Sequence, residues 1–142
     1  METNTATKIT VESTINAPVE KVWQCWNEPL HITKWCQAND DWHAPYADND
    51  LRTGGSFKTT MAAKDGSFSF DFGGVYDNVD EHRLIEYTMQ DGRQVKIIFT
   101  SEDNTTHVVE TFDAETTNSA ELQQQGWQAI LNSFKHYTEG SK

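Results

Sequence analysis

The sequence has few basic residues, no long apolar run and only two cysteines. Its 11 Lys and Arg are set against 22 Asp and Glu, so the formal net charge is −11. A surface of this charge repels phosphates, which makes nucleic acid and anionic membranes poor partners. The apolar runs are far shorter than the roughly 20 residues of a membrane-spanning helix. No basic segment followed by an apolar one begins the sequence, so no secretory signal is expected.

The cysteines and histidines offer no metal or redox motif. Cys25 and Cys36 lack C-x-x-C spacing, so we interpret them as small buried hydrophobic residues of a protein in a reducing, cytoplasmic compartment. The five histidines are scattered along the chain. Asp40, Asp41 and His43 lie close together, but an acidic loop is usually just solvated. We therefore expect no metal site and no cofactor.

What is present is enough apolar sequence for one folded domain. The hydrophobic share is 36% of 142 residues, and a domain of this size buries about 70% of the surface of its unfolded chain. Residues 1–7 are polar, and we expect them to form a flexible N-terminal segment. We expect a single domain over residues 8–140.

The hydrophobic pattern changes period along the chain. Residues 8–15 alternate as a half-buried strand, and the segment Asn16-Ala17-Pro18 then reads as the start of a helix that ends at Pro29. A second short helix should follow, and after it about six strands joined by turns such as Lys64-Asp65-Gly66 and Gln90-Asp91-Gly92. We expect Gly73-Gly74 to bend one of these strands.

The last segment has helical spacing. Trp127, Ile130, Leu131, Phe134 and Tyr137 recur at steps of three and four residues, within a predicted helix from Thr117 to Gly140. Thr117, Asn118 and Ser119 offer N-terminal caps. Gly126 is a poor helix former, and its bare backbone suggests a close approach by another element.

This order predicts an α+β fold: a curved antiparallel sheet wrapped around a long C-terminal helix, with two short helices after the first strand. The apolar face of the sheet needs a cover, and only the terminal helix is long enough to provide it. One helix rarely fills the hollow of a curved sheet, so we expect a cavity between them.

Six segments carry a resemblance to a known family. They are NAPVEKVW at 16–23, KW at 34–35, DLRTGGSF at 50–57, GVY at 74–76, IEYT at 85–88 and QGW at 125–127. With them the chain resembles the activator of heat-shock-protein-90 ATPase homologue-like branch of the START/Bet-v-1-like (SRPBCC) superfamily, over nearly its whole length. The resemblance implies the helix-grip fold with a deep apolar cavity. Members include lipid carriers, metabolite binders, polyketide cyclases and chaperone co-factors, so the fold does not choose a function.

The aromatic residues are the main candidates for a binding site. Tyrosine and tryptophan carry a polar tip on an apolar body, which suits a pocket for an amphipathic guest. Alternatively, each ring fills the core itself. The predicted ligand-binding residues are Trp26, Trp35, Trp42, Phe57, Phe70, Tyr76, Tyr87, Phe99, Trp127 and Leu131.

Glu110 is the main candidate for chemistry, and two strand registers are open for it. If Val108 and Phe112 point inward, Glu110 points inward with them, and burial would raise its pKa. If instead His107, Val109 and Thr111 point inward, Glu110 is a solvated edge charge.

Three hypotheses follow. The first is binding of a small, largely apolar or amphipathic molecule in the cavity, by a protein that is not an enzyme. The second is a cyclase- or hydrolase-type enzyme in the same cavity, with Glu110 or a tyrosine as acid or base. The third is an interaction module that modulates the ATPase of a chaperone through its surface.

Overall fold

The computed structural model describes residues 8–37, 41–116 and 118–140. The predicted flexible segment 1–7, Asp40 and Thr117 lie outside the described residues. The elements in chain order are β1 (Lys8–Ile15), α1 (Val19–Asn27), α2 (Pro29–Trp35), β2 (Trp42–Asn49), β3 (Ser56–Ala63), β4 (Ser69–Asp80), β5 (Leu84–Met89), β6 (Gln94–Glu102), β7 (Thr105–Asp113) and α3 (Ala120–Gly140). The predicted order of elements is confirmed.

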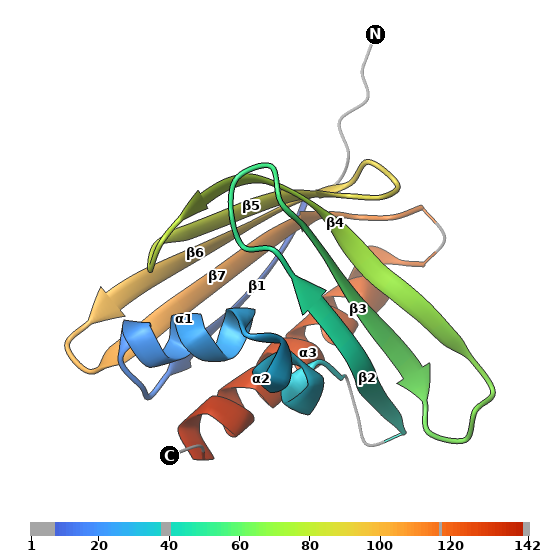
Figure 1. The fold of residues 1–142 in the computed structure, drawn as a ribbon, viewed down its shortest axis with the longest axis horizontal. Helices are drawn as coiled ribbons and strands as arrows, with labels where there is room; N and C mark the ends of the chain where they lie inside the picture. The colour runs from blue at the N-terminus through green and yellow to red at the C-terminus, as the bar shows by residue number, and fades with distance from the viewer. Residues whose placement is uncertain (1–7, 38–40, 117, 141–142) are drawn as a thin grey trace, which may run out of the picture.

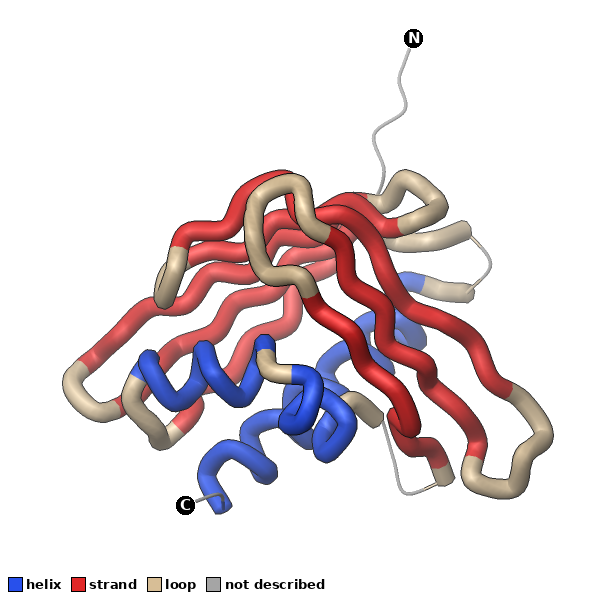
Figure 2. Tube along the Cα trace, in the orientation of Figure 1, coloured by secondary structure: helices blue, strands red, loops and turns tan. Residues whose placement is uncertain are grey.

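All seven strands form one antiparallel sheet, in the order β1-β7-β6-β5-β4-β3-β2. Strands β2 to β7 are the predicted meander, and β1 joins it at the far edge by pairing with β7 along its whole length, from Lys8 opposite Asp113 to Ile15 opposite Thr106. The sheet is strongly curved (Figure 1), and all three helices lie on its concave side (Figure 2). The predicted α+β helix-grip fold is therefore confirmed.

Helix α3 is held to the sheet along the β1 edge. The side chains of Gln124, Gln128 and Lys135 donate hydrogen bonds to the carbonyl oxygens of Thr10, Glu12 and Thr14, over 3.2, 3.2 and 2.7 Å. These alternate carbonyls belong to an edge strand that has no further strand to pair with, and an unpaired edge invites aggregation. The helix therefore covers the edge and is positioned by it at the same time.

The ends of the helices follow local chemistry. At α3, the Ser119 hydroxyl accepts a hydrogen bond from the Leu122 amide over 3.1 Å, as the predicted cap requires. At α1, the helix begins at Val19, directly after the predicted start segment Asn16-Ala17-Pro18. Pro18 occupies the cap position with an extended backbone, and its carbonyl accepts the first helical bond from Val22. Pro29 begins α2, where its missing N–H costs nothing.

Strand β4 pairs regularly at Gly73 and Gly74, and its register against β5 shifts between Tyr76 and Asn78, so a bend at the two glycines stays a prediction. A Cβ on Gly73 would lie 2.4 Å from the Phe57 carbonyl oxygen on β3, and one on Gly74 would lie 2.3 Å from the Thr88 carbonyl oxygen on β5. The neighbouring strands thus close in on β4 at these two positions, and only glycine leaves room for them.

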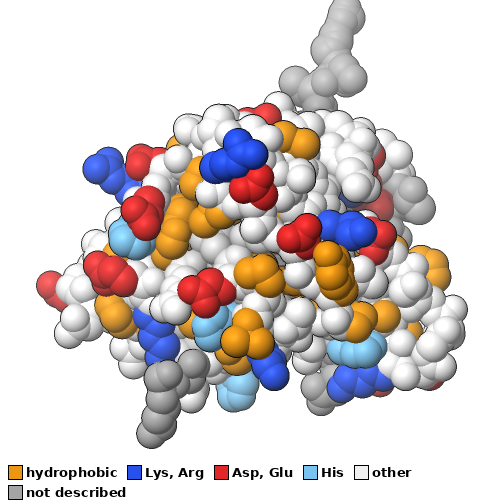
Figure 3. Space-filling view, in the orientation of Figure 1, with side chains coloured by type: hydrophobic (Ala, Val, Ile, Leu, Met, Phe, Trp, Pro, Cys, Tyr) orange, Lys and Arg blue, Asp and Glu red, His pale blue; other side chains and the backbone are white. Residues whose placement is uncertain are grey.

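The outer surface mixes charges of both signs with small apolar areas. On the face drawn in Figure 3, acidic, basic and apolar side chains are interspersed. Exposed apolar side chains of the described chain include Leu30, Phe68 and Leu122. None of the helices within the described ranges is long and apolar enough to cross a membrane.

The close approach at Gly74 gives a first prediction. Gly74→Ala should lower the free energy of unfolding by about 1–3 kcal/mol, because the new methyl group overlaps the backbone of β5. Gly126→Ala is the matched control: its Cβ meets no atom within 4 Å, and alanine favours the helix by about 0.5–1 kcal/mol. Urea unfolding followed by circular dichroism measures both. A Gly74→Ala variant as stable as the parent would contradict the steric argument.

Candidate functional site

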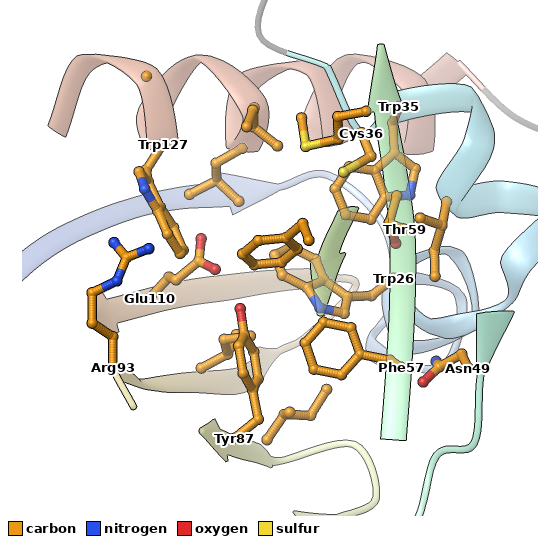
Figure 4. Close-up of a pocket in the computed structure, with 18 of the residues that line it drawn as sticks. Trp26, Trp35, Cys36, Asn49, Phe57, Thr59, Tyr87, Arg93, Glu110 and Trp127 are labelled. Carbon is orange, nitrogen blue, oxygen red and sulfur yellow. The ribbon is translucent and has the colours of Figure 1, made fainter. Parts of the chain in front are cut away.

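A cavity of about 350 Å³ lies between the concave face of the sheet and α3, and α1 and α2 border one end of it. Its lining is mostly apolar and comes from helices and strands across the whole fold (Figure 4). Eight of the ten predicted ligand-binding residues line it: Trp26, Trp35, Phe57, Phe70, Tyr76, Tyr87, Trp127 and Leu131. The expected cavity is therefore present, and the aromatic rings form its walls without filling it.

Two of the predicted residues, Trp42 and Phe99, are not among the lining residues. Phe99 is 3% exposed and packs edge-on against Trp26, with ring centroids 5.7 Å apart, so it lies behind the wall as ordinary core. Trp42 begins β2 at the sheet edge, where its ring meets Phe68 and Phe70 at 6.1 and 6.0 Å. Alternation gives the face on which a residue lies but not its position along that face, which explains both differences.

The walls contain two groups of packed rings. On the sheet side, Phe57 meets Tyr87 edge-on at 4.7 Å and Tyr76 at 5.1 Å. On the helix side, Trp26 and Trp35 each meet Phe134 of α3 at 4.8 and 4.9 Å. Edge-to-face pairs of this kind hold rings in fixed orientations, so the walls of the cavity are preformed.

Trp127 joins the two sides. It projects from α3, and its ring stacks on Phe112 of β7 with centroids 3.8 Å apart and planes 12° from parallel. Its edge faces Phe72 of β4 at 6.1 Å. The ring therefore spans from the terminal helix to the sheet at one end of the cavity.

Glu110 lies on the inward face of β7, which settles the register that the sequence left open. Its backbone partners are Val11 on β1 and Ile97 on β6, and both of these side chains are buried on the concave side. Val108 and Phe112 are fully buried on the same face as Glu110, which is itself 6% exposed. The carboxyl group therefore points into the cavity (Figure 4).

The surroundings of Glu110 hold it in its neutral form. Within the part of the chain that the structure describes, it has no hydrogen-bond partner and no ion pair. Burial raises the pKa of its carboxyl group from 4.5 to about 8, because the charged form loses its hydration and gains nothing in return. At neutral pH the side chain is therefore mostly a carboxylic acid, which can donate a hydrogen bond.

Tyr87 and Tyr76 differ in the state of their hydroxyl groups. The Tyr76 hydroxyl donates to Oδ1 of Asn49 over 2.5 Å, and Asn49 in turn donates to the carbonyl of Asn27 over 2.6 Å. The Tyr87 hydroxyl has no such partner among the described residues. Burial, and next the negative charge of Glu110, raise the pKa of Tyr87 well above its usual value. The two free polar groups, Tyr87 and Glu110, thus lie close enough to interact electrostatically.

Cys36 and Arg93 are among the further ionisable groups that line the cavity. Burial raises the pKa of the Cys36 thiol to about 12, so Cys36 is the inert buried cysteine that the sequence predicted. Arg93, in the turn before β6, is half-buried and holds Asp91, with 2.8 Å between Nε and Oδ2. Its positive charge partly opposes the rise in the pKa of Tyr87, which places it at the same end of the cavity.

Gly126 faces the cavity from α3, and the expectation of close packing there was wrong. A Cβ at this position would meet no heavy atom within 4 Å. A larger residue would extend into the open volume, so glycine keeps the cavity empty at this turn of the helix. The sequence alone does not distinguish a glycine that allows close packing of a neighbouring element from one that borders an open cavity.

Several lining residues were missed by sequence reasoning. Thr59, Met61, Ile85 and Ile97 stand on inward faces of their strands, so the same alternation that selected Phe57 and Tyr87 could have found them. Arg93 and Asn49 had no such signal, because a turn residue and a strand end carry no periodicity. Arg52 is not among the lining residues and holds its own loop, with Nε 3.0 Å from each carboxylate oxygen of Asp50.

The burial of Glu110 predicts how stability depends on pH. Between about pH 4.5 and 8 the unfolded chain ionises Glu110 while the folded protein does not, so stability is lost as the pH rises. Relative to the parent, Glu110→Gln should therefore gain stability with pH across this window, by up to about 1.4 kcal/mol per pH unit, and level off above it. The contributions of the other ionisable groups to the free energy of unfolding are shared by both proteins and cancel in this comparison. Urea unfolding of both proteins at several pH values measures the difference, and parallel curves would contradict it.

Comparisons with known proteins agree with this architecture. The family described as "Activator of Hsp90 ATPase homolog 1-like protein" matches residues 16–139. A protein from Cytophaga hutchinsonii, solved in solution, is 67% identical with a TM-score of 0.81, covering 93% of this chain and 92% of that one. The AHSA1-like protein from Aeromonas hydrophila is 46% identical with a TM-score of 0.88, covering 94% of this chain and 92% of that one.

More distant structures share the fold alone. A Chromobacterium violaceum protein is 21% identical with a TM-score of 0.84, covering 95% of this chain and 99% of that one. No curated protein matches the chain. The match to the family over most of the sequence, together with the two related structures, establishes that this chain belongs to the Activator of Hsp90 ATPase homolog 1-like family.

Proposed function

We propose that this protein binds a small, largely apolar molecule in the cavity between the sheet and α3. The observation that carries the proposal is the cavity itself, about 350 Å³ in volume with preformed aromatic walls. Ligand sites in proteins are commonly apolar, concave, and equipped with a few polar groups that orient the guest. Glu110 and Tyr87 are groups of this kind.

The cost of such a cavity supports its use. Apolar side chains that border an unfilled space lack packing partners on that side, so the lining of this cavity forgoes dispersion contacts that a filled core would make. A bound apolar molecule would restore the lost contacts, and its binding free energy would stabilise the folded state.

Turnover in the same cavity has less support. A hydrolase needs an activated nucleophile or a base beside a water molecule. Of the described lining residues, Cys36 and Tyr87 hold their protons more tightly than usual. Glu110 has no described partner that would turn it into one half of an acid–base pair. Binding without chemistry therefore agrees better with the ionisation of these groups.

A chaperone-modulating role is the second candidate, and the family's printed name is the one observation that favours it. Such a role would use the outer surface, where apolar and charged side chains are interspersed on the face of Figure 3. Measuring the ATPase rate of an Hsp90-type chaperone with and without this protein tests it. A rate that does not change ends this candidate.

A reducing, cytoplasmic location is part of the same proposal. Both cysteines are buried as free thiols. Proteins of oxidising compartments tend to pair their cysteines, so two unpaired thiols agree with a reducing compartment.

The cavity proposal predicts saturable binding that a single substitution removes. In an amide NMR titration with sterols, flavonoids, fatty acids and aromatic polyketides, a binder should shift the signals of Phe57, Trp127 and Leu131. Gly126→Phe should weaken that binder at least tenfold, because the new ring extends into the open cavity.

Gly140→Phe is the matched control, since it makes the same change at the end of the same helix, outside the cavity lining. It should leave the affinity unchanged. If no compound shifts the cavity signals of a well-dispersed spectrum, or if both variants lose binding equally, the cavity proposal is wrong.

A further inference from the structure

We infer that the ligand is a neutral molecule that presents a hydrogen-bond acceptor, a carbonyl oxygen, to the carboxyl group of Glu110 and the hydroxyl group of Tyr87. The inference rests on the proposed binding function and specifies the chemistry of the guest. It combines the position of these two groups in one cavity with the absence of partners for either of them among the described residues.

The two groups converge from different strands. Glu110 comes from β7 and Tyr87 from β5, with β6 between them. The curvature of the sheet turns both side chains toward the same end of the cavity, as Figure 4 shows. Their electrostatic interaction agrees with this placement. A single ligand atom between them could reach both.

Buried polar groups in proteins normally have partners, and the side chains of Glu110 and Tyr87 have none among the described residues. Elsewhere in the same wall the rule holds: Tyr76 donates to Asn49, and Nε1 of Trp35 donates to the carbonyl of Cys25 over 2.8 Å. Outside the cavity lining, the Thr138 hydroxyl is also without a partner among the described residues. A hydrogen-bonding group left without a partner in an apolar site costs free energy that a ligand can recover. The free pair therefore marks where the polar end of a ligand would lie.

The protonation states of Glu110 and Tyr87 decide whether the ligand accepts or donates the hydrogen bonds. With a pKa of about 8, Glu110 carries its proton at neutral pH, and the Tyr87 hydroxyl is neutral as well. Each then has one O–H to donate. Two O–H donors at the same end of an apolar cavity suit an oxygen acceptor, and other proteins use a protonated carboxyl group and a tyrosine in this way to hold a carbonyl group.

A charged ligand would bind less favourably in this cavity than a neutral one. A cation would meet a neutral carboxyl group at Glu110, which offers it no opposite charge. An anion would have to enter a protein of net charge −11, where Arg93 is already paired with Asp91. Either ion would also lose its hydration in a mostly apolar cavity.

The size of the cavity limits the guest to about two rings. An apolar cavity of about 150 Å³ holds one benzene molecule, so one of about 350 Å³ has room for two rings and a linking group. Benzophenone has this shape and a central carbonyl. Diphenylmethane lacks only the oxygen, benzhydrylamine replaces it with a cation, and diphenylacetate replaces it with an anion.

The test measures the dissociation constants of these four probes by NMR titration at pH 6. Benzophenone should bind about tenfold more tightly than diphenylmethane, the gain expected when a free donor finds an acceptor. It should also bind more tightly than either charged probe. Above pH 8 the affinity for benzophenone should fall, because the ionised carboxylate no longer donates and repels the carbonyl oxygen.

Substitutions test whether Glu110 and Tyr87 cause the preference for benzophenone over diphenylmethane. Glu110→Leu and Tyr87→Phe should each reduce the tenfold preference for benzophenone to threefold or less. Tyr76→Phe is the matched control: it removes a tyrosine hydroxyl that Asn49 already satisfies, and should keep the preference. Glu110→Gln keeps a donor that does not titrate, so it should retain the preference and lose the pH dependence.

The pH dependence of binding has to be assigned to Glu110 and not to the other titratable groups that face it. These are Tyr87 and Tyr76 on the sheet, and Cys36 after α2. Arg93 lies at the same end of the cavity, Asp48 and Glu115 are further lining residues, and the described part of α3 presents no titratable side chain to it. Burial raises the pKa of Cys36 and of both tyrosines, so these groups stay protonated over this range. Any pH dependence that persists in Glu110→Gln belongs to the remaining groups and would count against the assignment.

The outcomes separate the two proposals. If benzophenone and diphenylmethane bind equally well, the cavity binds ligands but the pair does not recognise an acceptor, and the inference is overturned alone. Tighter binding of benzhydrylamine, lost in Glu110→Gln, would overturn it in favour of a cationic ligand, and tighter binding of diphenylacetate in favour of an anionic one. If none of the four probes binds, the inference fails for guests of this size, and the panel titration with Gly126→Phe decides the cavity proposal separately.

Discussion

One geometric constraint shapes this molecule: a single long helix has to cover the concave face of a seven-stranded curved sheet. The helix is tied down on one side, where the side chains of Gln124, Gln128 and Lys135 bond to the exposed carbonyls of β1. Its apolar stripe then reaches β7 through the stack of Trp127 on Phe112. Toward β3, β4 and β5 the helix cannot also make close contact, and the cavity is the volume that remains.

The helices after β1 complete the enclosure through aromatic packing. Trp26 of α1 and Trp35 of α2 both lean on Phe134, the most deeply buried aromatic residue of α3. The hydrogen bond from Trp35 to the carbonyl of Cys25 fixes the two short helices to each other. This side of the cavity is therefore built by helices packing on one another, and its shape does not depend on a ligand.

Much of this could be predicted from the sequence, because the elements have strong local periodicity. The strands, both hairpin turns and the apolar face of the terminal helix all follow from patterns within a few residues of each other. The register of β7 could not be predicted in this way, since Val108 and Val109 are equally apolar and each supports a different register. Pairing across the sheet decides it: Glu110 lies opposite Val11 and Ile97, and both of these neighbours point inward.

The residues of the site that could not be predicted from the sequence also depend on contacts between elements. Alternation placed Phe57 and Phe99 on inward faces, yet only Phe57 reaches the cavity, because the distance from α1 and α3 differs along each strand. The openness at Gly126 is likewise a property of what lies opposite the residue, and no local pattern encodes it. Sequence reasoning thus gives the faces of the elements, and the spacing between elements gives the site.

Three locally unfavourable choices meet at this one cavity. Gly126 weakens the middle of α3 without making room for any neighbour. Glu110 places a carboxyl group where ionisation is costly, and Tyr87 leaves its hydroxyl unbonded among the described residues. Each would be improved by a common substitution if stability were the only requirement. Departures from the usual rules of stability tend to concentrate where a protein functions. Their occurrence in the lining of one cavity is therefore an argument for a bound molecule that does not depend on the volume of the space.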